Sequence, residues 1–192
     1  AQGDGSVMSR EALLLLGACR IDVTPERPVP LAGFAVRSGL GPYASGHRPI
    51  HARIFALADA GDSPEPGGEQ PASRRAAVVV SADLLWWGGD RVPAFKRLVA
   101  ARYGLDEDAV LLHGTHSHSA PMAGFAFTSY LGAPDTAYIE TLESRVLAGI
   151  GEALAAMVPV RVLRGSGEFA LGINRRGLLR SPPETGPGSM NR

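Results

Sequence analysis

The 192-residue chain has almost no cysteine or lysine: Cys19 is its one cysteine and Lys96 its one lysine. A single cysteine excludes an intramolecular disulfide framework and a zinc site built from several cysteines, and it fits a reducing compartment without requiring one. The chain also has no net charge, because 19 basic residues balance 19 acidic ones. It therefore has no long-range electrostatic field that would attract nucleic acid or anionic lipid. We therefore expect no nucleic-acid partner.

Long apolar runs are also missing, since none approaches the ~18 residues of a transmembrane helix. The run Ala12–Ala18 before Cys19 superficially resembles a lipoprotein cleavage box, but its apolar core is short and Glu11 spoils the positive flank. We interpret it as part of a buried first strand, preceded by a leader over residues 1–12. Without a convincing export signal, a cytoplasmic location is favoured and secretion stays open.

What is present, 45% hydrophobic and 20% charged residues, is typical of a globular protein, and the periodicity predicts an α/β fold. Strands are expected at Leu13–Val23, Ala52–Asp59, Ala76–Ala82, Ala109–Gly114, Val160–Arg164 and Glu168–Ile173. Helices are expected at Asp90–Tyr103, with Asp90 as N-cap and Gly104 as stop, and at Thr136–Met157.

Proline and glycine mark the connections between these elements. Gly61–Arg75 is expected to be an exposed connection, and residues 181–192 a flexible tail after a domain over residues 13–180. The strand, helix and strand between Ala76 and Gly114 form a β-α-β crossover, which makes the two strands parallel. Both strands then end at the same edge of a mixed, partly parallel sheet with flanking helices, where open α/β sheets bind ligands. Asp83 follows the first strand, and a histidine-rich turn follows the second.

Three of the five histidines, His113, His116 and His118, fall within six residues. In an extended segment His116 and His118 point the same way, so two neutral imidazoles can address one divalent metal, and imidazole suits zinc. The alternative, equally favoured by spacing alone, is a polar turn in which the rings are only hydrogen-bonded. His113 points to the opposite face, where a structural role is favoured.

Other side chains near this edge have two or three interpretations each. Asp83 can fix a histidine tautomer, ligate a metal or cap the following turn, and the first is favoured over ligation. Trp86 and Trp87 can wall an apolar pocket or fill the core. The apolar loop over residues 121–127 suits a lid or ordinary packing. Asn174 and Arg175 can orient a polar group of a substrate or lie on a solvated loop.

Together these segments resemble the N-terminal part of the catalytic domain of the neutral/alkaline (non-lysosomal) ceramidases, which are zinc-dependent amide hydrolases. The matching pieces occur in the family's order: Gly17–Pro25, Leu31–Phe34, His51–Leu57, Val80–Leu84, Gly114–Pro121 and Gly172–Arg175. The piece Gly-Thr-His-Ser-His-Ser-Ala-Pro at Gly114–Pro121 is the most specific. Two departures point to a pocket shaped for something other than ceramide: Ala120-Pro121-Met122 where the family usually has Gly-Pro-Gly-Gly, and Arg176 where it has serine after Asn-Arg.

The resemblance implies a role for each matched residue. His116 would be a zinc ligand, and His118 would lie beside the metal and polarise or position the substrate. Asp83 becomes a partner that orients the metal site, and Arg175, Asn174, Gly33 and Trp86 become substrate contacts. The implied reaction is hydrolysis of an N-acyl amide, or its reverse, by zinc-activated water.

A catalytic zinc needs about three protein ligands, and the resemblance places the others, a histidine, a glutamate and a tyrosine, beyond Arg192. The chain is therefore expected either to be completed by a second chain or a later segment of the same gene product, which is favoured, or to be a degenerate relative with an incomplete metal site. The non-enzymatic alternative is a binding module that keeps the fold, and a homo-oligomer is also possible. An amidohydrolase barrel ranks low because too few residues follow the histidines for eight β-α units.

Overall fold

The structure, a computed structural model, describes residues 14–59, 76–126 and 129–168. The chain divides into two units, Ala1–Arg161 and Val162–Arg192. All helices and strands described below belong to the first unit, and the described part of the second, residues 162–168, has no regular secondary structure. The expected leader boundary, the connection Gly61–Arg75 and the tail 181–192 lie outside the described residues.

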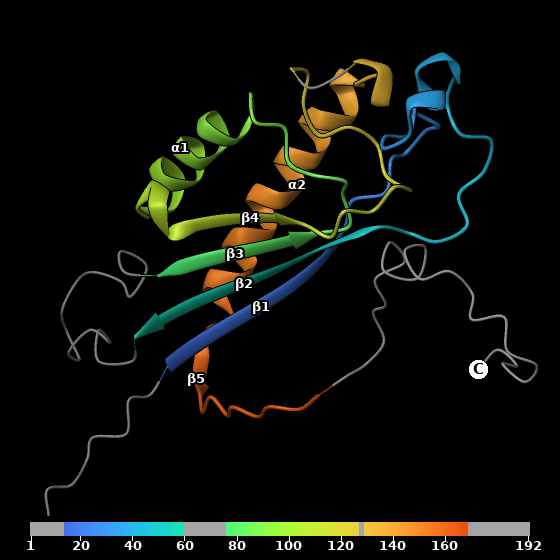
Figure 1. The fold of residues 1–192 in the computed structure, drawn as a ribbon. Helices are drawn as coiled ribbons and strands as arrows, with labels where there is room; N and C mark the ends of the chain where they lie inside the picture. The colour runs from blue at the N-terminus through green and yellow to red at the C-terminus, as the bar shows by residue number, and fades with distance from the viewer. Residues whose placement is uncertain (1–13, 60–75, 127–128, 169–192) are drawn as a thin grey trace, which may run out of the picture. The chain divides into compact units, whose positions relative to one another are not determined.

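Five strands form one mixed sheet in the order β4-β3-β2-β1-β5 (Figure 1). Their bounds are β1 Leu14–Asp22, β2 His51–Asp59, β3 Ala77–Ala82, β4 Val110–Gly114 and β5 Val158–Val160. The β3–β4 pair is parallel and the other pairs are antiparallel. The predicted class, α/β with a mixed, partly parallel sheet and flanking helices, is confirmed.

Two helices, α1 (Val92–Tyr103) and α2 (Thr136–Ala155), cover one face of this sheet (Figure 1). Along β2 every second residue from Ala52 to Ala58 is buried, as expected for a strand with one covered face. Phe95 of α1 and Ile150 of α2 join the same apolar core as Ile54. The hydroxyl of Tyr103 donates to the carbonyl oxygen of Leu147 at 2.7 Å and links the two helices.

The other face of the sheet carries a row of apolar side chains, one from each of four strands. Register places Phe55 between Ala18 and Val79, and Leu111 beside Val79. Phe55 is 37% exposed and Leu111 59% exposed. Large exposed apolar side chains gathered on one surface are typical of a surface that receives a partner. We call these four residues the open-face row.

Two expectations about element ends were wrong. A strand over Val160–Arg164 is not observed, because β5 ends at Val160, which pairs with Leu14 of β1, and residues 161–168 have no regular secondary structure. Asp90 does not cap α1; Arg91 holds that position, and the Asp90 carboxylate accepts a hydrogen bond from the Phe125 backbone at 3.0 Å. The predicted stop at Gly104 is confirmed, with φ of +68°.

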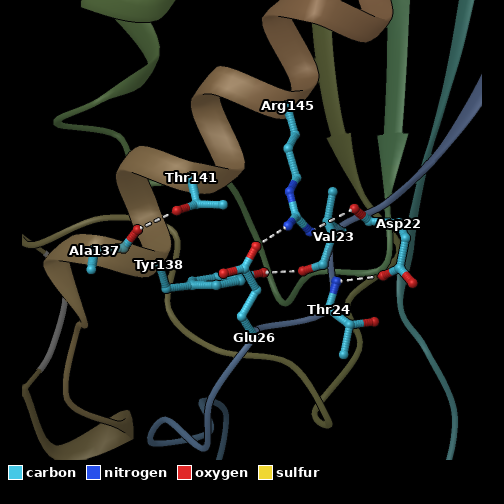
Figure 2. Close-up of polar contacts among 8 residues, drawn as sticks. All are labelled: Asp22, Val23, Thr24, Glu26, Ala137, Tyr138, Thr141 and Arg145. Atoms are coloured by element: carbon cyan, nitrogen blue, oxygen red, sulfur yellow. Dashed lines mark hydrogen bonds and ion pairs between the residues drawn. The ribbon is translucent and has the colours of Figure 1, made fainter.

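Helix α2 holds the chain where β1 ends (Figure 2). The Tyr138 hydroxyl donates to the Val23 carbonyl oxygen at 3.1 Å. Arg145 donates to the Asp22 carbonyl oxygen at 3.2 Å and to the Glu26 carboxylate. Burial raises the pKa of Tyr138 above its usual value, so the hydroxyl stays a donor. These contacts fix the direction in which the chain leaves the sheet toward the loop that meets the histidine turn.

The one cysteine, Cys19, lies on the helix-covered side of β1, and its thiol is weakly reactive. The Cys19 thiol donates to Glu152 of α2 at 3.0 Å. Burial and this carboxylate raise the pKa of Cys19 to about 11, so the thiol form predominates at neutral pH.

Among the described helices, none combines the length and apolar character needed to cross a bilayer.

We predict that Gly17→Ala strongly destabilises the fold. A Cβ at Gly17 would lie 1.8 Å from the Ala153 carbonyl oxygen of α2, so the helix would have to move off β1. The free energy of unfolding, measured by urea titration, should fall by about 3 kcal/mol, the upper end for overpacking. Gly41→Ala, where a Cβ meets nothing within 4 Å, is the matched control and should change it by less than about 0.5 kcal/mol. Equal unfolding midpoints for the two variants would contradict this packing.

Candidate functional site

The loops that follow β3 and β4 run side by side at one edge of the sheet. The Thr115 backbone donates to the Ala82 carbonyl oxygen at 2.9 Å, and the Ser117 backbone donates to the Leu84 carbonyl oxygen at 3.0 Å. The predicted convergence of the two strand ends is therefore observed. It places His116 between two backbone hydrogen bonds that cross from one loop to the other.

His116 and His118 come together, but not through an extended segment. His116 has φ of +63°, in the left-handed region, and is the one non-glycine residue with positive φ among those the structure describes. Extended backbone at this point was therefore a wrong expectation. The two rings lie edge to face with centroids 5.0 Å apart and an interplanar angle of 78°. Strained backbone of this kind is concentrated at functional sites in proteins.

The ring of His116 is oriented by the loop after β3. Its Nδ1 lies 3.1 Å from the Leu85 carbonyl oxygen, and since a carbonyl only accepts, Nδ1 must carry the proton. The Nε2 atom of the neutral ring then keeps its lone pair. A backbone carbonyl that holds one ring nitrogen while the other stays free is the usual arrangement behind a metal-binding histidine. Trp86 lies beside the ring, with centroids 6.3 Å apart.

His118 is held by the loop that follows β1. Its Nδ1 is buried, with no hydrogen-bond partner among the described residues, and a Cβ at Gly33 would lie 2.6 Å from it. Gly33 itself has φ of +110°, which an L side chain rarely adopts. The Phe34 ring lies 4.7 Å from the His118 ring, measured between centroids. Gly33, expected from the resemblance to contact substrate, therefore lies directly against His118.

Arg37 is a site residue that the sequence analysis missed. Its Nη1 donates to the carbonyl oxygen of Ala32 and to that of His118, which lies 81 residues after Arg37 in the chain. Its guanidinium also lies 4.8 Å from the centre of the Phe34 ring. A lone arginine after a Gly-Phe pair carries no motif, so only the folded contacts identify it.

Asp83 binds β2 rather than a histidine in its observed contacts. It accepts hydrogen bonds from the His51 backbone and from the Arg53 guanidinium, both at 3.0 Å. Asp83 lies at the end of β3, as predicted. That it orients a histidine of the metal site stays a prediction. His113 lies on β4 within 3.0 Å of the Ser81 hydroxyl, where the favoured structural role fits.

The loop after the histidines is mostly packed. Residues from Pro121 to Gly124 are buried, and Phe125 is exposed beneath the Arg91 guanidinium. Gly124 packs against Gly88, so tightly that a Cβ at Gly124 would lie 2.5 Å from the Gly88 Cα. Ordinary packing, rather than a lid, is therefore the interpretation that this part of the loop supports.

The two tryptophans separate into different environments. Trp86 is half-buried against a small apolar cluster formed by Ala32, Leu85 and Met122. Trp87 packs in the main core and stacks on Phe95 with centroids 6.2 Å apart. Trp86 is thus the one beside the histidines, as a pocket wall requires. Asn174 and Arg175 lie outside the described residues.

The described residues supply two ring donors at this edge and no complete metal cage. No group of three or more histidine, cysteine, aspartate and glutamate side chains in residues 14–59, 76–126 and 129–168 could hold a metal ion. The pair alone is compatible with a shared ion. With Zn–N bonds of about 2.1 Å and a tetrahedral angle, two imidazole centroids lie about 5 Å apart.

The fold is similar to that of two solved ceramidase structures. One is the neutral ceramidase from Pseudomonas aeruginosa and the other a ceramidase complexed with C2; each matches with a TM-score of 0.62 and 22% identity over 78% of this chain. This chain spans 22% of the length of each of those chains. No protein-family model matches, and a search of curated proteins finds no match. The ceramidase-like fold expected from the motifs is thereby confirmed.

We predict that Gly33→Ala displaces the His118 ring while leaving the fold intact. The added Cβ would meet Nδ1 and Cγ of that ring at 2.6 and 2.9 Å and would strain a backbone with φ of +110°. The imidazole signals of His118 in ¹⁵N-resolved NMR spectra should shift, with those of His113 unchanged.

Gly39→Ala is the control, because a Cβ there meets nothing within 4 Å and lies in the same loop. If Gly33→Ala and Gly39→Ala give the same His118 signals, Gly33 does not set the position of that ring.

Proposed function

We propose that this chain is part of a zinc-dependent hydrolase that cleaves, or in reverse forms, an N-acyl amide bond. The observation that carries the proposal is the pair His116 and His118, with ring centroids 5.0 Å apart and a left-handed backbone at His116, at the edge where open α/β sheets bind ligands. The likeness in fold to ceramidases supports an amide as the bond attacked. The N-acyl amides of lipid metabolism are then the class of substrate.

The two histidines fit a zinc ion. His116 would ligate through Nε2, since its Nδ1 is committed to the Leu85 carbonyl oxygen. His118 would lie beside the metal and hold or move a proton at the amide. A bound zinc would supply a water of lowered pKa and would polarise the amide carbonyl.

The remaining predicted residues keep supporting roles in this proposal. Gly33 leaves the space that the His118 ring occupies, and Trp86 offers an apolar wall beside His116. Asp83 fixes the end of β3 through His51 and Arg53, and so helps to place the loop that carries Leu85. Asn174 and Arg175 remain proposed substrate contacts.

We further propose that a second chain or another segment completes the metal site. His116 is one assigned ligand of the three that a catalytic zinc needs, and this chain spans 22% of the similar ceramidase chains. The open-face row also offers an apolar surface on which further polypeptide can pack. The rival proposal is a binding module that keeps the fold without chemistry.

The test compares zinc content and amide hydrolysis in two samples: this chain alone, and the chain together with any polypeptide that its gene encodes after Arg192. The completed protein should bind about one zinc and hydrolyse a linear N-acyl amide. His116→Ala should lower both zinc affinity and turnover to about a hundredth or less.

His113→Ala is the matched control, since that histidine lies on β4 with Ser81 and should leave zinc affinity and turnover unchanged. Stoichiometric zinc on the isolated chain would contradict completion by another segment. An unchanged turnover in the His116→Ala variant would contradict the catalytic proposal.

A further inference from the structure

Two pockets of the described residues adjoin each other beside the histidine turn. The first, of about 360 Å³, is lined by Thr24 and Pro25, Leu31, Tyr43, residues 45–50, and Ser119 with Pro121. The second, of about 310 Å³, is lined by residues 40–43 and Arg37. Leu31 and Tyr43 line both. We call the two together the basic groove.

The groove combines an apolar floor with positive charge. Leu31, Tyr43 and Ile50 supply apolar surface, while Arg37 and Arg48 supply positive charge. Neither lining contains an aspartate or glutamate. An acidic group on an apolar chain is the ligand that complements such a surface.

The arginines of the groove differ from several others in the described part of the chain. Arg27, Arg53, Arg91 and Arg145 each form an ion pair with a carboxylate. Arg48 forms none within the described residues, and the Nη1 of Arg37 donates only to main-chain carbonyl oxygens there. Arg37 has further N–H donors on Nε and Nη2. Both guanidiniums therefore keep donors for an anionic ligand.

Neither histidine lines the groove, but the groove and the candidate active site share the loop that follows β4. Ser119, which lines the first pocket, directly follows His118. Arg37, which lines the second, donates to the His118 carbonyl oxygen. Leu31 pairs with Pro121 in an isolated β-bridge that fixes the groove floor to the histidine turn. A ligand in the groove would thus lie against the same loop that carries the two imidazoles.

We propose that the basic groove binds the carboxylate of an N-acyl amide substrate, which makes N-acyl amino acids, rather than uncharged amides, the substrate class. The inference rests on the proposed function and deepens it. Each of the two pockets has a volume near the lower end of ordinary ligand sites, which suits a small amphiphile of this kind.

Isothermal titration calorimetry tests the assignment with two probes that differ in their terminal group, the charged carboxylate of N-octanoylglycine and the uncharged carboxamide of N-octanoylglycinamide. The titrations use the full chain in metal-free buffer at low ionic strength, so that binding is measured separately from turnover. The acid should bind at least about tenfold more tightly than the amide, and salt should reduce the difference.

Variants at Arg48 identify the groove as the binding place. Arg48→Gln should remove most of the preference for the acid, Arg48→Lys should retain most of it, and Arg97→Gln, an exposed position on α1, should leave it unchanged. Equal affinities for the two probes, binding of neither, or a preference insensitive to Arg48→Gln would overturn the inference. Arg48-dependent preference for the acid in a protein that hydrolyses no amide would support the groove and count against the proposed function.

Discussion

The left-handed backbone at His116 is the constraint on which the candidate site depends. A non-glycine residue at φ of +63° costs of order 1–3 kcal/mol, so the surrounding structure has to hold it there. The backbone hydrogen bonds of Thr115 and Ser117 to the loop after β3 do so from either side. The same loop supplies the Leu85 carbonyl oxygen that orients the His116 ring. One turn therefore sets both the position and the tautomer of this imidazole.

This turn exists because β3 and β4 are parallel neighbours. Their ends reach the same edge, where the two loops hydrogen-bond and the chain from the end of β1 completes the site with Gly33 and Arg37. Helix α2 does not contact the site but affects it indirectly. It anchors the end of β1 through Tyr138 and Arg145 (Figure 2), and so sets the direction of the loop that contacts His118. The packing of one face of the sheet is thereby linked to the geometry of the site.

The features that local sequence patterns determine, the strands, the helices and the crossover between β3 and β4, were predicted from the sequence. Apolar runs and helical periodicity located β1 to β4 and both helices, and the crossover between β3 and β4 placed Asp83 and the histidines at one edge. Contacts between distant segments were not predictable in this way. The Asp90 carboxylate is bound to the backbone of Phe125, 35 residues away, rather than capping the adjacent helix. Arg37 donates hydrogen bonds to carbonyl oxygens of two separate loops and so holds them together, and no sequence motif predicts that role.

The most direct test of the account is the tautomer of His116, measured from the ¹⁵N chemical shifts of its ring nitrogens in the metal-free protein at a pH where the ring is neutral. The proton is expected on Nδ1, held by the Leu85 carbonyl oxygen, with Nε2 unprotonated and available to a metal. A ring protonated on Nε2, or one that averages between the two tautomers, would contradict it.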